Sequence, residues 1–164
     1  MEDKSITSRG GKNELYLRIL DQFPNPIWRS GVDTKCNFFN KNWLEFTGRT
    51  MDQEVGDGWV EGVFKDDLDV CIKTYLDSFA KREPFQMEYR LKHHDGTYHW
   101  ILDSGSPFFD DNGVFLGYIG SCYDLQDIKE KMAQVESMNR MMLDRELKMV
   151  ALKAEIDKLK GKTE

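Results

Sequence analysis

The sequence predicts an α+β domain with a five-stranded antiparallel sheet, short helices on one face of it, a helix before it and a long helix after it. The dipeptides Asp95-Gly96 and Asn112-Gly113 are strong two-residue hairpin turns, and they separate three β-rich runs at 85–94, 97–109 and 114–124. Helical spacing of apolar residues is confined to the segments before and after these runs. This order lacks the strand–helix alternation of a parallel sheet and therefore indicates the α+β class.

The N-terminal residues predict a flexible tail, a helix and two strands. Residues 1–11 are polar and end in two glycines, which is typical of a loose tail. Apolar residues at helical spacing then predict an amphipathic helix over residues 12–23, which stops before Pro24 because the residue before a proline avoids helical geometry. Two short runs, 26–29 and 36–39, predict a pair of strands around a turn.

Three helices are predicted between the two groups of strands. Asn40 can cap a short helix that Gly48 ends. Thr50 and Gln53 have the spacing of a capping box, which predicts the start of a second short helix. A longer helix is expected at 66–81, because two acidic residues that suit the helix dipole precede a wide apolar face at helical spacing.

Residues 125–160 predict a long helix that pairs with another helix. They contain no glycine, proline or aromatic residue, and their apolar residues follow two heptad frames that meet near Val135 in a stammer. Arg145 is the polar exception in the second frame. We expect a parallel homodimer, with docking of this methionine-rich stripe on a different protein as the alternative. The predicted dimer seam comprises Ile128, Met132, Val135, Met142, Met149, Leu152, Ile156 and Leu159.

Charge and cysteine usage exclude several classes of function. The chain carries 23 Lys and Arg against 29 Asp and Glu, a net charge of −6, and the acidic excess lies in residues 1–124. We therefore expect neither nucleic acid nor a membrane as partner. No apolar run reaches the ~18 residues of a membrane span, and no signal peptide is recognisable. Cys36, Cys71 and Cys122 lack CxxC spacing. The expected location is the cytoplasm.

Several segments within residues 24–128, taken together, resemble one family of signalling domains. They are Pro26-Ile27-Trp28-Arg29, the stretch 40–48 (NKNWLEFTG), Gly58-Trp59, Pro84-Phe85, Glu88-Tyr89-Arg90-Leu91, Asp95-Gly96-Thr97-Tyr98-His99-Trp100 and Gly117-Tyr118-Ile119-Gly120-Ser121-Cys122. In these segments the sequence resembles the bacterial PAS sensor domains. The resemblance implies a PAS domain at 24–124, between the flanking helix at 12–23 and an output or dimerisation helix at 125–160, with a tail at 161–164.

Three positions depart from the family pattern. Phe64-Lys65-Asp66-Asp67 stands where the family usually reads His-Pro-Asp-Asp, and His99 replaces the arginine that usually precedes the hairpin tryptophan. These two changes concern helix entry and the sheet surface, so we expect the fold to tolerate them. The third change lies at the signalling joint, where the closing Asp-Ile-Thr of the family is here Asp124-Leu125-Gln126. The resemblance assigns signal relay to these three residues.

The resemblance also implies a pocket for a ligand or cofactor between the sheet and the helices. A close-packed core without any ligand is the alternative interpretation of the same residues. The candidate pocket wall comprises Trp28, Phe38, Leu68, Cys71, Tyr75, Met87, Tyr89, Leu91, Ile101, Tyr118 and Cys122.

The cofactor is not identified by the sequence, and we expect none. A covalent flavin photoadduct needs an Asn-Cys-Arg-Phe run, but the equivalent residues 56–60 contain no cysteine. Non-covalent flavin, stacked on Trp28, Trp43 or Trp59, and haem, with Cys71 as the thiol on the long helix, are the two alternatives left open.

Three histidines surround the first hairpin turn. His93 and His94 precede Asp95-Gly96, and His99 follows it across the hairpin. Adjacent residues of a strand point to opposite faces, so we expect His93 and His94 to diverge. The histidines are therefore interpreted as solvated turn residues, and no metal site is predicted.

Together these features predict a sensory module of signal transduction. The module would sense a small ligand, cofactor or redox state and relay it through the coiled coil to a partner such as a histidine kinase of a two-component system. A ligand-free module for protein–protein interaction or dimerisation is the alternative. No catalytic residue and no enzyme activity are expected, because a GxSxG motif is absent and Arg9-Gly10-Gly11-Lys12 lacks the spacing of a phosphate-binding loop.

Overall fold

The computed structural model describes residues 9–160. The predicted tail at 161–164 and residues 1–8 of the predicted N-terminal tail lie outside the described residues. The chain divides into two compact units between Leu125 and Gln126, and each unit is described by itself.

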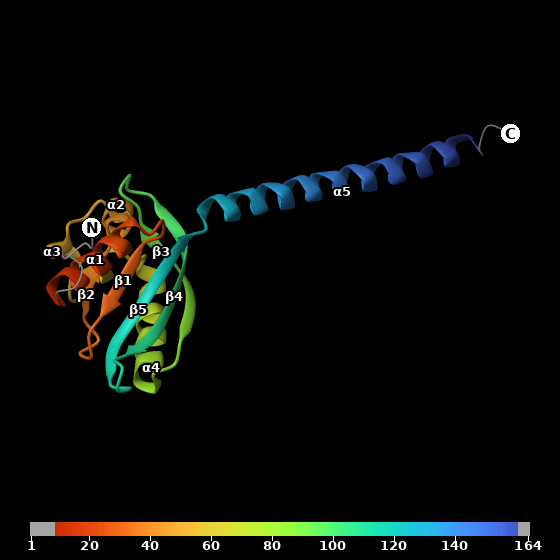
Figure 1. Cartoon of the computed structure of the whole chain (residues 1–164). Helices are drawn as coiled ribbons and strands as arrows, with labels where there is room; N and C mark the ends of the chain where they lie inside the picture. The colour runs from red at the N-terminus through yellow and green to blue at the C-terminus, as the bar shows by residue number, and fades with distance from the viewer. Residues whose placement is uncertain (1–8, 161–164) are drawn as a thin grey trace, which may run out of the picture. The chain divides into compact units, whose positions relative to one another are not determined.

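The first unit contains a five-stranded sheet whose neighbouring strands are all antiparallel (Figure 1). Its spatial order is β2-β1-β5-β4-β3, so the two N-terminal strands join the three-stranded meander through β1 and β5. The predicted sheet is therefore confirmed. The strands are β1 (Ile27–Ser30), β2 (Cys36–Phe39), β3 (Phe85–Lys92), β4 (Tyr98–Phe109) and β5 (Phe115–Asp124).

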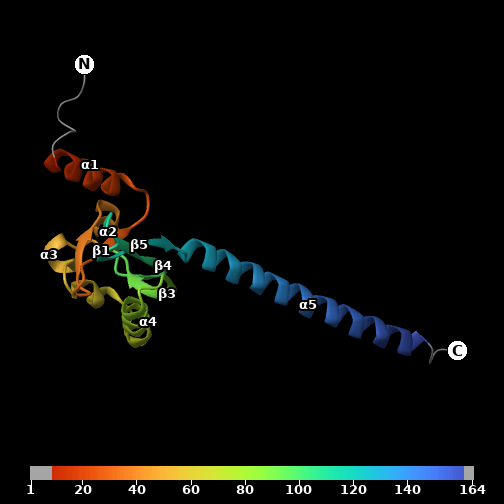
Figure 2. The same cartoon turned by 60° about the horizontal axis from the view of Figure 1, so that its bottom comes forward.

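Helices between β2 and β3 cover one face of this sheet (Figures 1 and 2). Short apolar segments at helical spacing fold there because each can bury one face against the sheet. They are α2 (Lys41–Thr47), α3 (Met51–Glu54), the 3₁₀ turns η1 (Gly58–Gly62) and η2 (Lys65–Asp67), and α4 (Leu68–Lys81).

Side-chain caps set the ends of the short helices as predicted. The Asn40 side chain accepts a hydrogen bond from the backbone N–H of Trp43, and Gly48 ends α2 in the left-handed conformation at φ 68°. Thr50 and Gln53 form the reciprocal capping box of α3. Asn40 is fully buried, and its Oδ1 also accepts from the N–H of Ile27 at 2.8 Å. One side chain therefore joins β1 to the start of α2.

The N-terminal helix α1 spans Arg9–Gln22, so the boundary of the predicted tail at residue 11 is wrong by three residues. Its C-terminal end is held by the body of the domain: the Asn40 amide donates to the carbonyl of Leu20 at 2.9 Å, and the N–H of Lys41 donates to Asp21 Oδ1 at 3.1 Å. Once a helix is fixed in this way, each added residue gains a hydrogen bond. That gain offsets the loss of helix stability, about 1 kcal/mol for each glycine, at Gly10 and Gly11.

The core centres on Trp28, whose indole lies flat over two glycines of the sheet. Trp28 pairs with Gly120 on β5, and Gly120 pairs in turn with Gly105 on β4. A Cβ atom added at Gly120 would lie 2.3 Å from the indole, and one at Gly105 would lie 2.4 Å from the ring of Phe85. Both positions therefore require glycine because aromatic rings occupy the space above them.

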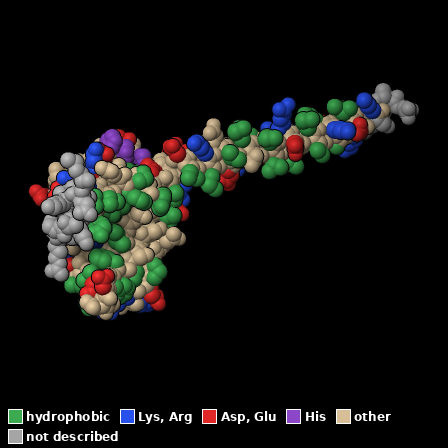
Figure 3. Space-filling model, viewed as in Figure 1, with side chains coloured by type: hydrophobic (Ala, Val, Ile, Leu, Met, Phe, Trp, Pro, Cys, Tyr) green, Lys and Arg blue, Asp and Glu red, His purple; other side chains and the backbone are tan. Residues whose placement is uncertain are grey.

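The second unit is the helix α5 (Gln126–Lys160), which confirms the predicted C-terminal helix. None of its residues is buried in the described chain, and Met142 is 60% and Ile156 50% exposed. Hydrophobic side chains recur along its length between charged ones (Figure 3). Across the described residues, no helix has the length and the apolar character that crossing a membrane requires.

Replacing Gly120 with alanine tests the close approach of Trp28. We expect Gly120→Ala to lower the free energy of unfolding by about 1–3 kcal/mol, because the added methyl group overpacks the core. Urea denaturation measures the change. The matched control is Ser121→Ala, whose side chain points to the opposite face of β5 and should leave stability nearly unchanged. Equal stability of the two variants would contradict this packing.

Candidate functional site

The most unusual residue of the core is the acidic side chain Asp103, which is only 3% exposed. It lies on β4 between Ile101 and Gly105 and points to the same face as both, because alternate residues of a strand share a face. The indole Nε1–H of Trp28 donates to its Oδ1 at 2.9 Å, and the Tyr89 hydroxyl donates to its Oδ2 at 3.3 Å. The thiol of Cys122, its direct partner on β5, donates as well.

Burial raises the pKa of Asp103 from 3.8 to about 6, although the three donors oppose the shift. Desolvation disfavours the charged carboxylate, and the hydrogen-bond partners named above are all neutral. Burial also raises the pKa of Tyr89 and of Cys122 well above their usual values. Both groups therefore remain protonated donors while Asp103 changes its protonation state near neutral pH.

Aromatic rings enclose a small cavity next to this carboxyl group. The cavity has a volume of about 10 Å³, which is room for about one water molecule. Pockets that hold drug-sized ligands measure about 300–1,000 Å³, so in this conformation the interior is closed to a flavin or a haem. The lining residues are Trp28, Cys36, Phe39, Trp43, Trp59, Tyr75, Phe85, Met87, Tyr89 and Asp103.

A buried ion pair holds one wall of the cavity. Glu54 is 1% exposed, accepts a hydrogen bond from the Trp43 indole at 3.0 Å and pairs with the guanidinium of Arg49 at 2.6 Å. Burial raises the pKa of Glu54 against the opposing effects of these two partners. Arg49 also donates to the carbonyl of Gly58 at 3.2 Å. The pair therefore anchors η1, the turn that carries Trp59.

The end of β5 is tied to β4 at two points. The backbone N–H of Leu125 donates to the carbonyl of Trp100 at 2.7 Å. Asp124 Oδ2 lies 2.8 Å from His99 Nδ1. Because Cys122 lies two residues before Asp124 on the same strand, β5 runs directly from the Asp103 network to the predicted relay residues.

Comparison with known proteins identifies the family. The family model described as PAS fold matches residues 37–122, half of the chain. The chain belongs to the PAS family. A curated relative, the uncharacterised protein y4lL of Sinorhizobium fredii, is 38% identical over 112 residues, which make up 68% of this chain and 14% of that protein. The chain therefore spans only a small part of this relative's length.

Solved structures of low sequence identity share the fold. An RNA-binding light-oxygen-voltage receptor matches with a TM-score of 0.67 and 16% identity, covering 85% of this chain and 40% of that one. A sensory box histidine kinase/response regulator from Burkholderia thailandensis matches with a TM-score of 0.54 and 18% identity, covering 82% of this chain and 98% of that one. At these identities the likeness shows that the chain shares the PAS fold with both proteins.

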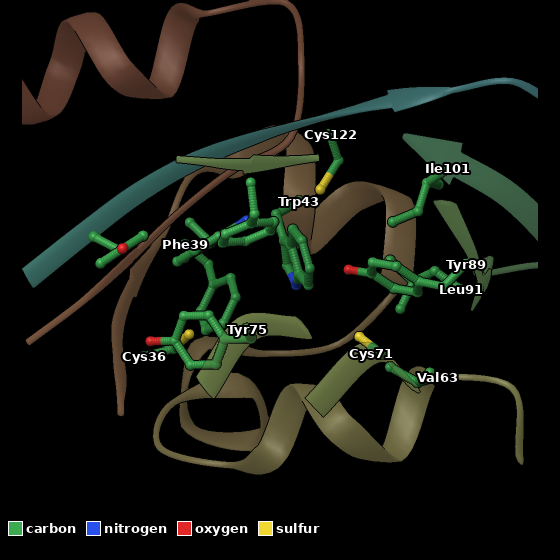
Figure 4. Packing of buried hydrophobic residues seen from close by; sticks show 13 residues of the cluster. Cys36, Phe39, Trp43, Val63, Cys71, Tyr75, Tyr89, Leu91, Ile101 and Cys122 are labelled. Carbon is green, nitrogen blue, oxygen red and sulfur yellow. The ribbon is translucent and has the colours of Figure 1, made fainter. Parts of the chain in front are cut away.

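The PAS core contains nearly all the predicted pocket residues. Leu68 and Met87 pack against the buried cluster, and whether any of these residues bind a ligand stays a prediction. Cys71 of α4 and Cys122 of β5 point into the interior toward Tyr89 (Figure 4). The predicted residues in the cluster itself are Trp28, Cys71, Tyr75, Tyr89, Leu91, Ile101, Tyr118 and Cys122.

Phe38 is misplaced in the predicted pocket wall. It pairs with Arg29 on the outer face of the sheet, where the guanidinium lies 5.8 Å from its ring centre. Phe39, the next residue, pairs with Trp28 and is 1% exposed. Successive residues of a strand face opposite sides of the sheet. The prediction put Phe38 on the inward side, but the inward residue is its neighbour Phe39.

Sequence reasoning missed Asp103 as the polar centre of the core. The available signal was its alternation with Ile101 and Gly105, which puts a carboxylate at an inward position of β4. Phe85 alternates in phase with Met87 and Tyr89 along β3, so the same signal was available for it, but the predicted pocket wall omits it. Trp43 and Trp59 entered the prediction only as stacking partners for a flavin.

The three cysteines of the described chain are free and buried. Burial raises the pKa of the Cys36 and Cys71 thiols far above the usual value, and nearby carboxylates add to the effect. Thiols in such surroundings are poor nucleophiles because the thiolate is the reactive form. Cys36 and Cys71 therefore act as apolar side chains in the core, whereas Cys122 donates to Asp103.

The expectation that His93 and His94 diverge is wrong. Their ring centres lie 4.0 Å apart, and the rings of His93 and His99 stack at 4.3 Å. β3 ends at Lys92, so both histidines belong to the turn, where the alternation of strand residues no longer applies.

Replacing Asp103 with asparagine tests the raised pKa of its carboxyl group. A folded-state pKa of about 6 against 3.8 means that this group adds stability below about pH 4, which is lost as the pH rises through 6. The full loss is about 3 kcal/mol. We expect Asp103→Asn to remove it, so that the variant gains stability relative to wild type between pH 4 and pH 8. Denaturant unfolding across this range measures the difference.

The matched control is Asp110→Asn in the β4–β5 turn. Backbone hydrogen bonds from Val114 and Asn112 lower the pKa of Asp110, so its stabilising effect is present at neutral pH and is lost on acidification. This variant should therefore change the pH dependence in the opposite direction. If Asp103→Asn follows the wild-type curve at every pH, the carboxyl group is not protonated in the way described.

Proposed function

We propose that this PAS domain senses a small organic cation in the aromatic cavity beside Asp103. It relays the binding through α5, paired as a coiled coil, to a signalling partner of the histidine kinase class. The single observation that carries the proposal is the buried carboxyl group of Asp103, which faces an aromatic cavity and has neutral hydrogen-bond partners.

The chemistry of the cavity wall favours a positively charged ligand. Aromatic faces attract cations through the ring quadrupole, and cages of such rings recognise quaternary ammonium groups. The wall supplies seven aromatic side chains and one carboxylate. A bound cation neutralises the negative charge of the ionised Asp103 carboxylate. Without a cation, the carboxylate is neutralised by taking up a proton. Cation binding and protonation are thus two ways of satisfying the same buried group.

Ligand entry requires that the closed core opens. A cavity of about 10 Å³ is smaller than any organic cation, so binding must be coupled to a movement of the wall. Trp59 on η1 and Met87 on β3 are half-buried, and they pack against the buried core cluster without belonging to it. They are the elements that can move with the least loss of packing. A ligand that binds the opened state better than the closed state shifts the population between them.

The proposed relay begins at the pair formed by Asp103 and Cys122. These residues are direct partners on β4 and β5, and the thiol donates to the carboxylate. A change in the charge of Asp103 alters this contact and is transmitted along β5 toward Asp124, Leu125 and Gln126. The last of these residues begins α5.

The proposed output is a parallel homodimeric coiled coil along α5. The second heptad frame puts Val135, Met142, Met149 and Ile156 at a positions, and Met138, Arg145, Leu152 and Leu159 at d positions. In register, two Arg145 side chains would meet within one layer of the seam. A charged layer lowers the stability of a coiled coil, and the stammer near Val135 offers a competing frame. A coil with these two weak points can change register or twist on a small input.

Graded amines test ligand binding. Thermal unfolding is followed with ammonium, methylammonium and tetramethylammonium chloride, and with the neutral tert-butanol as a control of similar size. We expect one or more of the cations to raise the unfolding midpoint while tert-butanol does not, because binding to the native state stabilises it. Asp103→Asn should abolish the increase. An equal response to cations and to sodium chloride at the same ionic strength would contradict cation recognition.

Arg145→Leu tests the coil. Removing two facing charges from the seam should strengthen dimerisation, which sedimentation equilibrium measures as a lower dissociation constant. Arg140→Leu is the matched control, because position 140 lies outside both a and d and its side chain is 76% exposed. A monomeric chain at all concentrations, or equal strengthening by both variants, would contradict the proposed seam.

A ligand-free interaction module is the second candidate function, and the closed cavity favours it. Tyr123 on β5 is 46% exposed and offers a contact for a partner. Trp100 is half-buried, and the guanidinium of Arg90 lies over its ring, 5.1 Å from the ring centre. Trp100 therefore offers less contact surface to a partner than Tyr123 does. If no amine shifts the unfolding midpoint and the chain still dimerises, this second function takes precedence.

A further inference from the structure

Three imidazoles and two carboxylates gather at the β3–β4 turn, outside the PAS core. His93 Nδ1 lies 3.1 Å from Asp95 Oδ1, and the His99 ring stacks on that of His93 at 4.3 Å. Asp124 Oδ2 lies 2.8 Å from His99 Nδ1. The histidines form a visible group at the surface (Figure 3). The proposed cation site uses none of these residues, and only Asp124 has a part in the proposed relay.

We propose that His93, Asp95 and His99 bind a divalent transition-metal ion of the zinc type. One nitrogen or oxygen atom from each residue lies within 4.8 Å of the others. Zinc binds histidine nitrogen at about 2.0–2.1 Å and carboxylate oxygen at about 2.0–2.2 Å, so rotations of the side chains are needed to bring all three atoms to one ion. Imidazole ligands select zinc, copper, nickel or iron over calcium and magnesium.

Neighbouring groups orient the ligands in the manner of known metal sites. A metal-binding histidine almost always donates the N–H of its other ring nitrogen to a carboxylate, a carbonyl group or a water molecule. Asp124 occupies that position at His99 Nδ1 and leaves Nε2 for the ion. Phe46 lies edge-on to both rings, at 5.0 Å from His93 and 5.7 Å from His99. The two histidine side chains are only 20% and 19% exposed, which limits competition from water.

Metal binding requires one local rearrangement. An imidazole nitrogen binds a metal in the plane of its ring, and the rings of His93 and His99 are nearly parallel, at 13°. Two stacked rings cannot both direct a nitrogen at one ion. One ring therefore turns about its side-chain bonds when the ion binds. Asp95 is 49% exposed and can follow this movement.

The position of the site gives metal binding a consequence for the chain. Asp124 would be held through His99, and it immediately precedes Leu125 and Gln126, where α5 begins. A bound ion thus fixes the β3–β4 turn to the last residue of β5. This inference does not depend on the ligand of the core, since the two sites share no residue.

Zinc titration of the full chain by isothermal calorimetry, with zinc chloride as the probe, tests the site. We expect one zinc ion per chain. His99→Gln should abolish binding, and Asp124→Asn should weaken it about 10–100-fold, as is typical when an orienting carboxylate is lost. His94→Gln is the matched control: it removes a neighbouring histidine outside the set of three and should leave the affinity unchanged.

Thermal unfolding of each variant in the presence of EDTA separates loss of the site from loss of the fold. Wild-type protein that binds no zinc overturns the proposal. So does His99→Gln protein that binds zinc with wild-type affinity, or His94→Gln protein that loses binding while it unfolds at the wild-type temperature.

Discussion

The burial of one carboxyl group against the N–H edge of one indole ring is the constraint on which the rest of this PAS domain depends. Trp28 donates to Asp103 while its ring lies over Gly120, so β1, β4 and β5 must meet in one register for the hydrogen bond to form. The carboxyl group is then buried among aromatic rings, and this burial raises its pKa to about 6 although the donors Trp28, Cys122 and Tyr89 oppose the shift. The same contacts thus set the sheet and create a group that changes charge near neutral pH.

Two parts of the chain combine a well-defined structure with a locally unfavourable one. The core is closely packed, yet it encloses a carboxyl group whose ionisation works against folding at neutral pH. The proposed coil has a regular apolar seam, yet Arg145 interrupts it. Unfavourable groups of this kind within a stable structure keep two conformational states close in free energy. A small ligand can then shift the population from one state to the other. In the proposed function, stability is thereby exchanged for responsiveness at the input and at the output.

Local signals made most of the fold predictable. The two hairpin turns and the caps at Asn40 and Thr50 depend on neighbouring residues alone, and each is found where the sequence predicts it. Prediction failed where the answer depends on distant partners. The strand β2 has only four residues and does not reveal its inward phase, which exchanged Phe38 with Phe39. The alternation along β4 puts Asp103 on the inward face, but no local rule shows how a carboxyl group is satisfied there. Its donors Trp28, Tyr89 and Cys122 come from three other strands.

The central claim is that the charge of Asp103 controls the coil, and a spin-label distance tests it most directly. A label at Ala154→Cys lies on the outer side of the second heptad frame, and the native thiols are buried and should resist labelling. We expect the interchain distance distribution of otherwise wild-type protein to differ below and above pH 6, and that of the Asp103→Asn protein to stay the same. A distribution that does not change with pH, or that changes equally in both proteins, would contradict the claim.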